Sequence, residues 1–196
     1  IIYDRNQGRM NGFGNVVINN YKDKIDVLGE YVFYDQNIDS AVVTGKALMI
    51  EYSQGDSLFM HADTLRMVTY NLNTDSVYRE MRAYHKVRTY RSDVQAVCDS
   101  LVYDTKDSCM VMYKDPITWN ENRQLLGEVI EVFMKDSTID KAHIIGQALS
   151  VEQIDNKDHF NQISSKEMYA YFRDKAVYRS DAISNVQSIY YPIDDK

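Results

Sequence analysis

Apolar and polar residues alternate along most of the chain, and this period of two predicts β-strands. One segment type recurs, in which an acidic residue precedes a run with apolar residues at alternate positions. Its copies begin at Glu30, Asp63, Asp99, Glu128 and Glu167. The steps between them, 33, 36, 29 and 39 residues, suit strands of fixed length joined by turns of variable length. Helical repeats need a 3.6-residue periodicity, which these segments lack.

Most of these runs end in a polar turn rich in Asp or Asn, and a second alternating run usually follows. The turns lie at residues 34–37, 71–75, 104–107, 135–138 and 173–175, and the returning runs at 41–47, 81–83, 109–113 and 142–148. Asp and Asn side chains bond the local backbone and tolerate left-handed conformations, so the chain needs few glycines. The pattern predicts an all-β chain of roughly ten or more antiparallel strands. We expect residues 1–196 to form one domain.

The apolar face changes parity at each acidic residue. Leu58 and Met60 precede Asp63 at even positions, whereas Leu65 and Met67 follow it at odd ones. A strand that keeps its apolar side inward across such a slip must bend or bulge there. Two interpretations remain: a local bulge in an ordinary sandwich, or stacked bends that fold the sheet into two facing layers around an apolar trough. Small residues suited to a tight corner stand at the slip, namely Gly29, Ala62, Cys98 and Gly127.

The trough interpretation identifies a set of lining residues, all at apolar positions of the alternating runs. They are Ile25, Val27, Val32, Tyr34, Val43, Leu58, Met60, Leu65, Met67, Val94, Leu101, Tyr103, Val111, Leu125, Ile130 and Ile144.

Charge and composition narrow the function classes. The chain carries 29 acidic and 22 basic residues, a formal net charge of −7, which argues against nucleic acid as a partner because such binding depends on Lys and Arg. The 16 tyrosines and 2 prolines agree with strands. The sequence has no apolar stretch long enough for a membrane-spanning helix.

We expect no enzyme, metal or cofactor site. Gly12-Phe13-Gly14 precedes a strand-like run and is expected to be a turn, not a phosphate-binding loop. The four histidines are scattered, in a pattern typical of structural or solvated roles. The regularly spaced acidic residues are interpreted as corner residues in preference to a catalytic pair. Cys98 and Cys109 either form one bridge across a hairpin or are two free thiols.

The repeats resemble the OstA-like (LptA-like) family of lipopolysaccharide-transport proteins over about residues 14–191. The resemblance rests on residues 25–30, 58–63 and 94–99, and on the returning runs at 42–47 and 144–148. The stretch from residue 161 to 191 is similar to the last repeat of larger Bacteroidetes-type members. Departures occur at Arg79–Arg82, which lacks the usual Gly, and at Ser165 and Ser184, where Gly is typical.

This resemblance implies a periplasmic β-jellyroll, or "β-taco", that is not an enzyme. It would shield the acyl chains of lipid A in an apolar groove while lipopolysaccharide crosses to the outer membrane. The implied partners are lipopolysaccharide, other OstA-like domains joined by strand addition at the sheet edges, and further copies of the chain in head-to-tail order. The alternative is an extracellular or periplasmic carbohydrate-binding or adhesin-like module, suggested by the many tyrosines.

Overall fold

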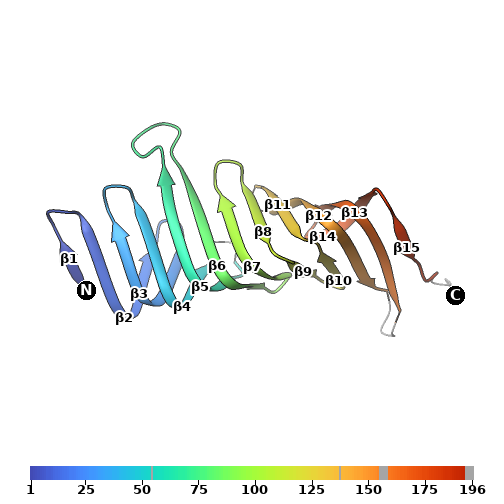
Figure 1. Cartoon of the computed structure of the whole chain (residues 1–196), viewed down its shortest axis with the longest axis horizontal. Coiled ribbons are helices and arrows are strands. Elements are labelled where there is room, and N and C mark those ends of the chain that lie inside the picture. The colour runs from blue at the N-terminus through green and yellow to red at the C-terminus, as the bar shows by residue number, and fades with distance from the viewer. Residues whose placement is uncertain (54, 137, 155–158, 193–196) are drawn as a thin grey trace.

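The computed structural model describes residues 1–53, 55–136, 138–154 and 159–192, and it is all-β within that part. Fifteen strands, all paired antiparallel, form one continuous sheet, and its first and last strands lie at opposite ends of the molecule (Figure 1). This confirms the predicted antiparallel all-β class. The strands are β1 (Ile2–Asp4), β2 (Arg9–Asn20), β3 (Ile25–Asp35), β4 (Ser40–Glu51), β5 (Leu58–Tyr70), β6 (Tyr78–Arg91), β7 (Val94–Asp104), β8 (Cys109–Tyr113), β9 (Ile117–Asn120), β10 (Arg123–Leu126), β11 (Val129–Lys135), β12 (Thr138–Gln153), β13 (Phe160–Arg173), β14 (Ala176–Ile183) and β15 (Gln187–Ile189).

A column of bulges runs across the sheet and divides it into two limbs. At each bulge two residues with positive φ lie opposite a single residue of a neighbouring strand, and the register shifts there. Four of these pairs lie within β2, β4, β6 and β12, and two lie just after β8 and β14. Two residues opposing one is the defining geometry of a β-bulge, and it bends the strand. The bend-or-bulge prediction is therefore confirmed. The pairs are Gly14 and Asn15, Gly45 and Lys46, His85 and Lys86, Lys114 and Asp115, Gly146 and Gln147, and Ser184 and Asn185.

We call the two parts limb A and limb B. Limb A ends in the turns at residues 36–39, 71–77, 105–108 and 174–175, and limb B ends in the turns at 21–24, 92–93 and 121–122. The turn at 71–77 is the long loop that projects at the top of Figure 1. Strands β8, β11 and β14 belong to limb A, whereas β9, β10 and β15 belong to limb B. Each long strand that is interrupted at the bulge column is therefore divided into two short strands, one in each limb.

The expected acidic residues stand at the column in four of the five repeats. Glu30, Asp63 and Asp99 each lie opposite a two-residue bulge, and Glu128 directly precedes β11. In the fifth repeat Lys166 takes this place, not Glu167 as the sequence pattern indicated, because Glu167 already pairs with Ile145 in limb A. The position is defined by the geometry of the bulge, and a negative charge is not required there.

The predicted small residues fit this column closely. A Cβ added to Gly29 would lie 2.4 Å from Val43 Cγ1, and one added to Gly127 would lie 2.5 Å from Ile144 Cγ2. At Gly29 and Gly127 the strands therefore approach each other too closely for a larger side chain. Ala62 and Cys98 occupy the same position in the second and third repeats and are buried.

Side chains from both limbs form a single buried cluster. Met60 and Ala96 come from limb B and Leu101 and Ile130 from limb A, and each is at most 7% exposed. Because residues of both limbs share one core, the inner faces of the limbs pack against each other. Burial of these apolar side chains is the main force that holds the sheet in its bent form.

The two cysteines are free in this structure. Cys98 lies at the bulge column, paired with Val87, whereas Cys109 lies at the far end of limb A, paired with Asp104. About half a strand therefore separates them, and the bridged alternative is not formed.

Candidate functional site

The interior between the limbs is lined by continuous rows of apolar side chains. In limb A one cross-strand row runs from β3 to β13, and every member is at most 5% exposed. Neighbouring members are directly opposite each other in the ladder. They are Val32, Val43, Leu65, Ala83, Leu101, Met112, Ile130, Ile144 and Met168.

Most of the predicted lining residues occupy this interior. Eight of them are buried in the core, namely Val32, Val43, Met60, Leu65, Leu101, Leu125, Ile130 and Ile144. Ile25, Val27 and Tyr103 are half-buried against the same cluster. Tyr34 and Met67 lie in the cross-strand row of Tyr103, closer to the limb A turns.

Val111 is wrongly assigned to the interior. It lies opposite Val102 and Glu131 on the outward face, whereas its neighbours Met110 and Met112 point inward. Every residue from Cys109 to Tyr113 is of apolar type, so the alternation in this strand gave no sign of which parity faces inward.

Methionine is the main lining residue that the sequence pattern underestimated. Eight of the nine methionines belong to the core cluster or pack against it, and Met67 faces the same way. The methionine side chain is unbranched, flexible and polarisable, and it adapts to irregular apolar partners. The alternating pattern identifies only Met60 and Met67 among them as lining residues. Methionine is nearly absent from the polar turns of the sequence, and this bias could have identified the other methionines as lining residues.

Two adjoining cavities lie between the limbs. A narrow apolar slot of about 90 Å³ lies among side chains of β7, β9 and β10 on one side and of β8, β11 and β12 on the other. A wider polar cavity of about 450 Å³ lies outside it. The two share five wall residues, among them Val94, Ile139 and Phe172. Two more predicted lining residues, Leu58 and Val94, are found here.

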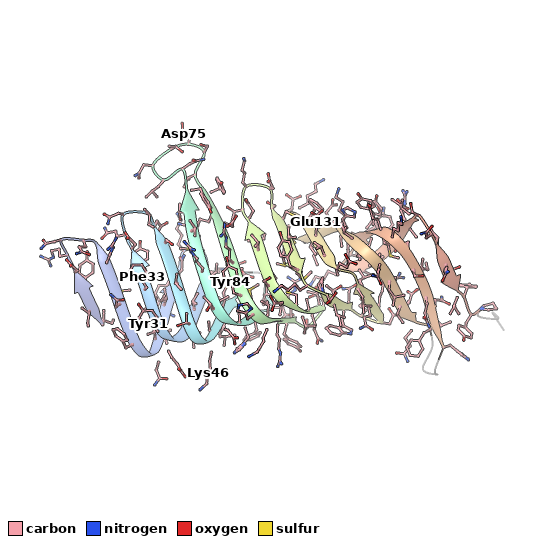
Figure 2. The ribbon with its side chains drawn as sticks, in the orientation of Figure 1. Tyr31, Phe33, Lys46, Asp75, Tyr84 and Glu131 are labelled. Carbon is pink, nitrogen blue, oxygen red and sulfur yellow. The ribbon has the colours of Figure 1, made fainter. Side chains whose placement is uncertain are left out.

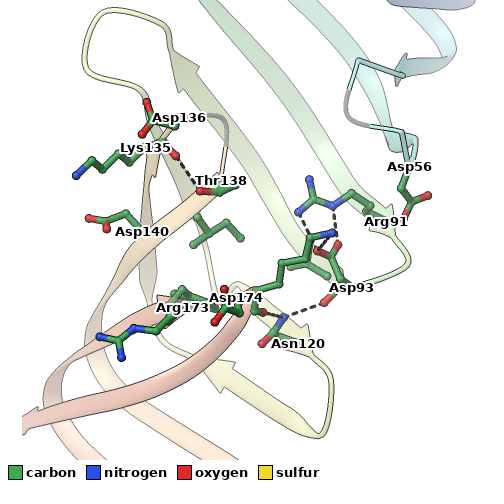
Figure 3. A pocket seen from close by; sticks show the side chains of 14 residues that line it. Asp56, Arg91, Asp93, Asn120, Lys135, Asp136, Thr138, Asp140, Arg173 and Asp174 are labelled. Atoms are coloured by element: carbon green, nitrogen blue, oxygen red, sulfur yellow. Dashed lines mark hydrogen bonds and ion pairs between the residues drawn. The ribbon is translucent and has the colours of Figure 1, made fainter.

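Polar side chains connect the turns of limb A to those of limb B across the wider cavity. We call this line of contact the seam. The Lys175 ammonium lies 3.6 Å from Asp93 Oδ2, and Asn120 Nδ2 donates to the carbonyl oxygens of Asp93 and Lys175, both at 2.9 Å. Figure 3 shows Asn120 between the turn of Asp93 and that of Asp174. A second contact lies further along the seam, where Arg79 reaches Asp23 Oδ2 at 3.2 Å.

Charge at the seam is balanced by these pairs. Burial raises the pKa of Asp93, but its hydrogen bond from Arg91 and the charges of Arg91 and Lys175 outweigh that effect, so the pKa lies below its ordinary value. Asp93 is therefore ionised at neutral pH and holds both cations. By contrast Lys135, Asp140 and Arg173 extend away from Asp93 at the rim of the cavity (Figure 3).

The acidic residues of the bulge column lie on the outside of the bend, where they form ion pairs. Lys46 lies 3.3 Å from Glu30 and Lys114 3.0 Å from Asp99. The hydrogen bonds from Lys114 and His85 lower the pKa of Asp99. Figure 2 shows Lys46 below the ribbon at the bend. These exposed pairs stabilise the bend only weakly. None of these carboxylates enters the interior.

Aromatic residues also occupy the outward face of limb A. Tyr31, Tyr84 and Tyr113 lie in one cross-strand row, linked through Thr44, Thr64 and Ser100. Phe33, Tyr84 and Glu131 are labelled on the limb that faces the viewer in Figure 2. The tyrosines are therefore divided between the two faces of the sheet.

Comparison with protein-family models finds no match, and comparison with curated proteins finds none either. Within the described residues, no group of three or more His, Cys, Asp or Glu side chains is placed to hold a metal ion. A search of the same residues for a helix long and apolar enough to cross a membrane finds none.

Proposed function

We propose that this protein is a non-enzymatic lipid carrier of the OstA-like type, whose bent sheet is a β-jellyroll that shields acyl chains between its limbs. Its cargo would be lipopolysaccharide, carried through the periplasm towards the outer membrane. The observation that carries the proposal is the continuous apolar interior, which extends across the strands from β3 to β13 and is bounded by polar turns.

The interior suits acyl chains for a physical reason. Each methylene removed from water contributes about 0.8 kcal/mol, so a long apolar surface binds a chain without any directional group. Similar side chains recur in successive strands, and a chain can therefore exchange one set of contacts for the next at little cost. Flexible methionines allow the packed core to open around a chain and close after it.

The surface charge supports acyl-chain burial as the source of affinity. With a net charge of −7 the protein gains little from the anionic phosphates of lipid A. Binding must then come from the apolar interior, and we expect it to depend only weakly on salt.

The ends of the sheet are the proposed contact surfaces for further OstA-like domains or further copies. Of the eighteen large apolar side chains that are strongly exposed in the described part, twelve lie near the two ends. An unpaired strand edge beside apolar side chains favours strand addition by a partner. These residues are Ile1, Ile2, Tyr3, Phe13, Val17 and Tyr21 at one end and Tyr178, Ile183, Val186, Ile189, Tyr190 and Tyr191 at the other.

A matched pair of tyrosines tests the proposal. Tyr103 faces inward and Tyr84 outward, and both are half-buried. A photo-crosslinking phenylalanine analogue at Tyr103 should trap lipopolysaccharide in envelope extracts, whereas the same analogue at Tyr84 should not. Equal labelling at both positions would contradict an interior lipid site.

A carbohydrate-binding or adhesin-like module is the second candidate. It is favoured by the outward row of Tyr31, Tyr84 and Tyr113, because aromatic rings on a flat sheet face can stack on sugar rings. This function predicts glycan binding that Tyr84→Ala abolishes and that a variant of the interior residue Tyr103 leaves unchanged. Lipid capture at Tyr103 without glycan binding would exclude it.

A further inference from the structure

Apart from the two ends of the sheet, the seam is the boundary of the interior at which no backbone pairing is found in the described part of the chain. The bulge column is closed by continuous strands, and neighbouring strands are joined by ladders of hydrogen bonds. Among the described residues, the polar contacts found across the seam are those of Lys175, Asn120 and Arg79. Separating the limbs there breaks these polar contacts and parts the apolar side chains beneath them, while the hydrogen-bonded ladders of the sheet remain intact.

One of these contacts lies directly over the route to the slot. Asn120 and Arg91 line both the polar cavity and the slot, and Lys175 lines the polar cavity and reaches across it to Asp93. Within the slot the walls are apolar, with Leu125 and Met112 among them. The cavity therefore leads from water to the core between the β6–β7 turn of limb B and the β13–β14 turn of limb A.

We propose that an unbranched acyl chain enters the interior sideways at this point, and that Lys175 with Asp93 and Asn120 is the latch of the opening. The chain occupies the slot once the methionines that line it move, and the polar head of the amphiphile stays in the 450 Å³ cavity. This inference rests on the proposed acyl-chain function and adds the point of entry and its control.

The seam contacts have the strength that a latch requires. The Lys175 side chain is 65% exposed and that of Asp93 16%, and an ion pair with so exposed a lysine contributes little to stability. The ion pair therefore adds little to the cost of opening, and an acyl chain that enters replaces the apolar contacts that opening breaks. A latch of this kind lets a chain enter without unfolding of either limb.

Covalent closure of the seam tests the proposal. In a Cys109→Ser background, Asp93→Cys and Lys175→Cys are joined by a short bis-maleimide reagent, and the same variant treated with N-ethylmaleimide is the matched control. Cys98 is retained because burial raises the pKa of its thiol to about 12, which leaves it unreactive. Uptake of cis-parinaric acid is followed by stopped-flow fluorescence.

We expect the cross-linked protein to lose the fast phase of uptake, while the N-ethylmaleimide control keeps it. Lys175→Ala should accelerate uptake by up to about fivefold, since it removes one exposed ion pair. Lys135→Ala makes the same charge change at the cavity rim, where its side chain extends away from Asp93, and should leave the rate unchanged.

Equal uptake by the cross-linked and control proteins would overturn lateral entry and favour entry from the ends. Equal acceleration by Lys135→Ala and Lys175→Ala would also overturn it, because the effect would then be one of net charge. Failure of the wild-type protein to take up the probe is a different result, since it would remove the acyl-chain function itself.

Discussion

Gly29→Ala tests whether the bend depends on close approach of neighbouring strands. The added Cβ would lie 2.4 Å from Val43 Cγ1 and 3.0 Å from the Thr44 carbonyl oxygen. Overpacking of this kind costs about 1–3 kcal/mol. The loss of unfolded-state entropy offsets about 0.4–1 kcal/mol of it, so we expect a net destabilisation of about 1–2 kcal/mol.

The second repeat suggests the compensating change. In that repeat Ala62 occupies the position of Gly29. Ala83 occupies the position of Val43, because each of these two residues lies two positions before the bulge of its own strand. Val43→Ala alone should cost about 2 kcal/mol, because it removes two buried methyl groups. The double variant removes most of the clash, so its free energy of unfolding should be only slightly lower than that of Val43→Ala. The interaction energy between the two substitutions should then be about 1–2 kcal/mol.

Urea unfolding followed by circular dichroism measures all four proteins of this cycle. Gly14→Ala is the control, because Gly14 has a φ of +68° and nothing within 4 Å of its added Cβ. It should cost about 1 kcal/mol through backbone strain alone, and Val43→Ala should not rescue it. If the costs of Gly29→Ala and Val43→Ala add to within about 0.5 kcal/mol, the two sites do not touch and the argument from close approach is wrong.

Further predictions concern the interior, the thiols, the seam and the ends. Met112→Ala should lower the free energy of unfolding by about 2–5 kcal/mol and the outward Val111→Ala by less than about 1 kcal/mol, and similar costs in urea unfolding would contradict the inward assignment. Burial raises the pKa of both thiols, so Cys98, with a pKa of about 12, should react with iodoacetamide at pH 8 much more slowly than the less buried Cys109; equal rates in a mass-spectrometric time course would refute this. Because the pKa of Asp93 is lowered, its carboxylate stabilises the fold above about pH 4 and this contribution is lost as the pH falls further, so Asp93→Asn should flatten the fall in stability below about pH 4. Light scattering should show mass increasing with concentration through end-to-end pairing, and a strict monomer throughout would count against it.

The bend could be predicted from the sequence because it follows from local geometry. Where alternate residues of a strand are apolar and the residues between them polar, as at Met60 and His61, the sequence shows which face points inward. At Asp63 the apolar residues change from even to odd positions, and this change requires a bulge. The same reasoning failed where both parities are apolar, so Val111 was placed inward and Met112 was not. The charge pattern marks Glu167 as the start of the fifth repeat, whereas bulge geometry gives that position to Lys166.

The seam could not have been predicted from the sequence. Asp93 and Lys175 are 82 positions apart, and no alternation within a strand indicates which turns meet. Their meeting depends on the twist and stagger of the whole sheet, which accumulates over many strands. The cavities depend in turn on where the limbs separate, so their position also follows only from the three-dimensional arrangement.

Mass spectrometry of lipid bound to the protein purified from its native envelope without detergent tests the central claim most directly. The account predicts that lipopolysaccharide, identified by its lipid A acyl chains, co-purifies with the wild-type protein. It also predicts that polar substitutions at inward positions such as Tyr103 reduce the yield, whereas the same substitutions at Tyr84 do not. Recovery of folded protein free of any acyl-chain lipid, with Tyr103 and Tyr84 variants indistinguishable, would contradict the account.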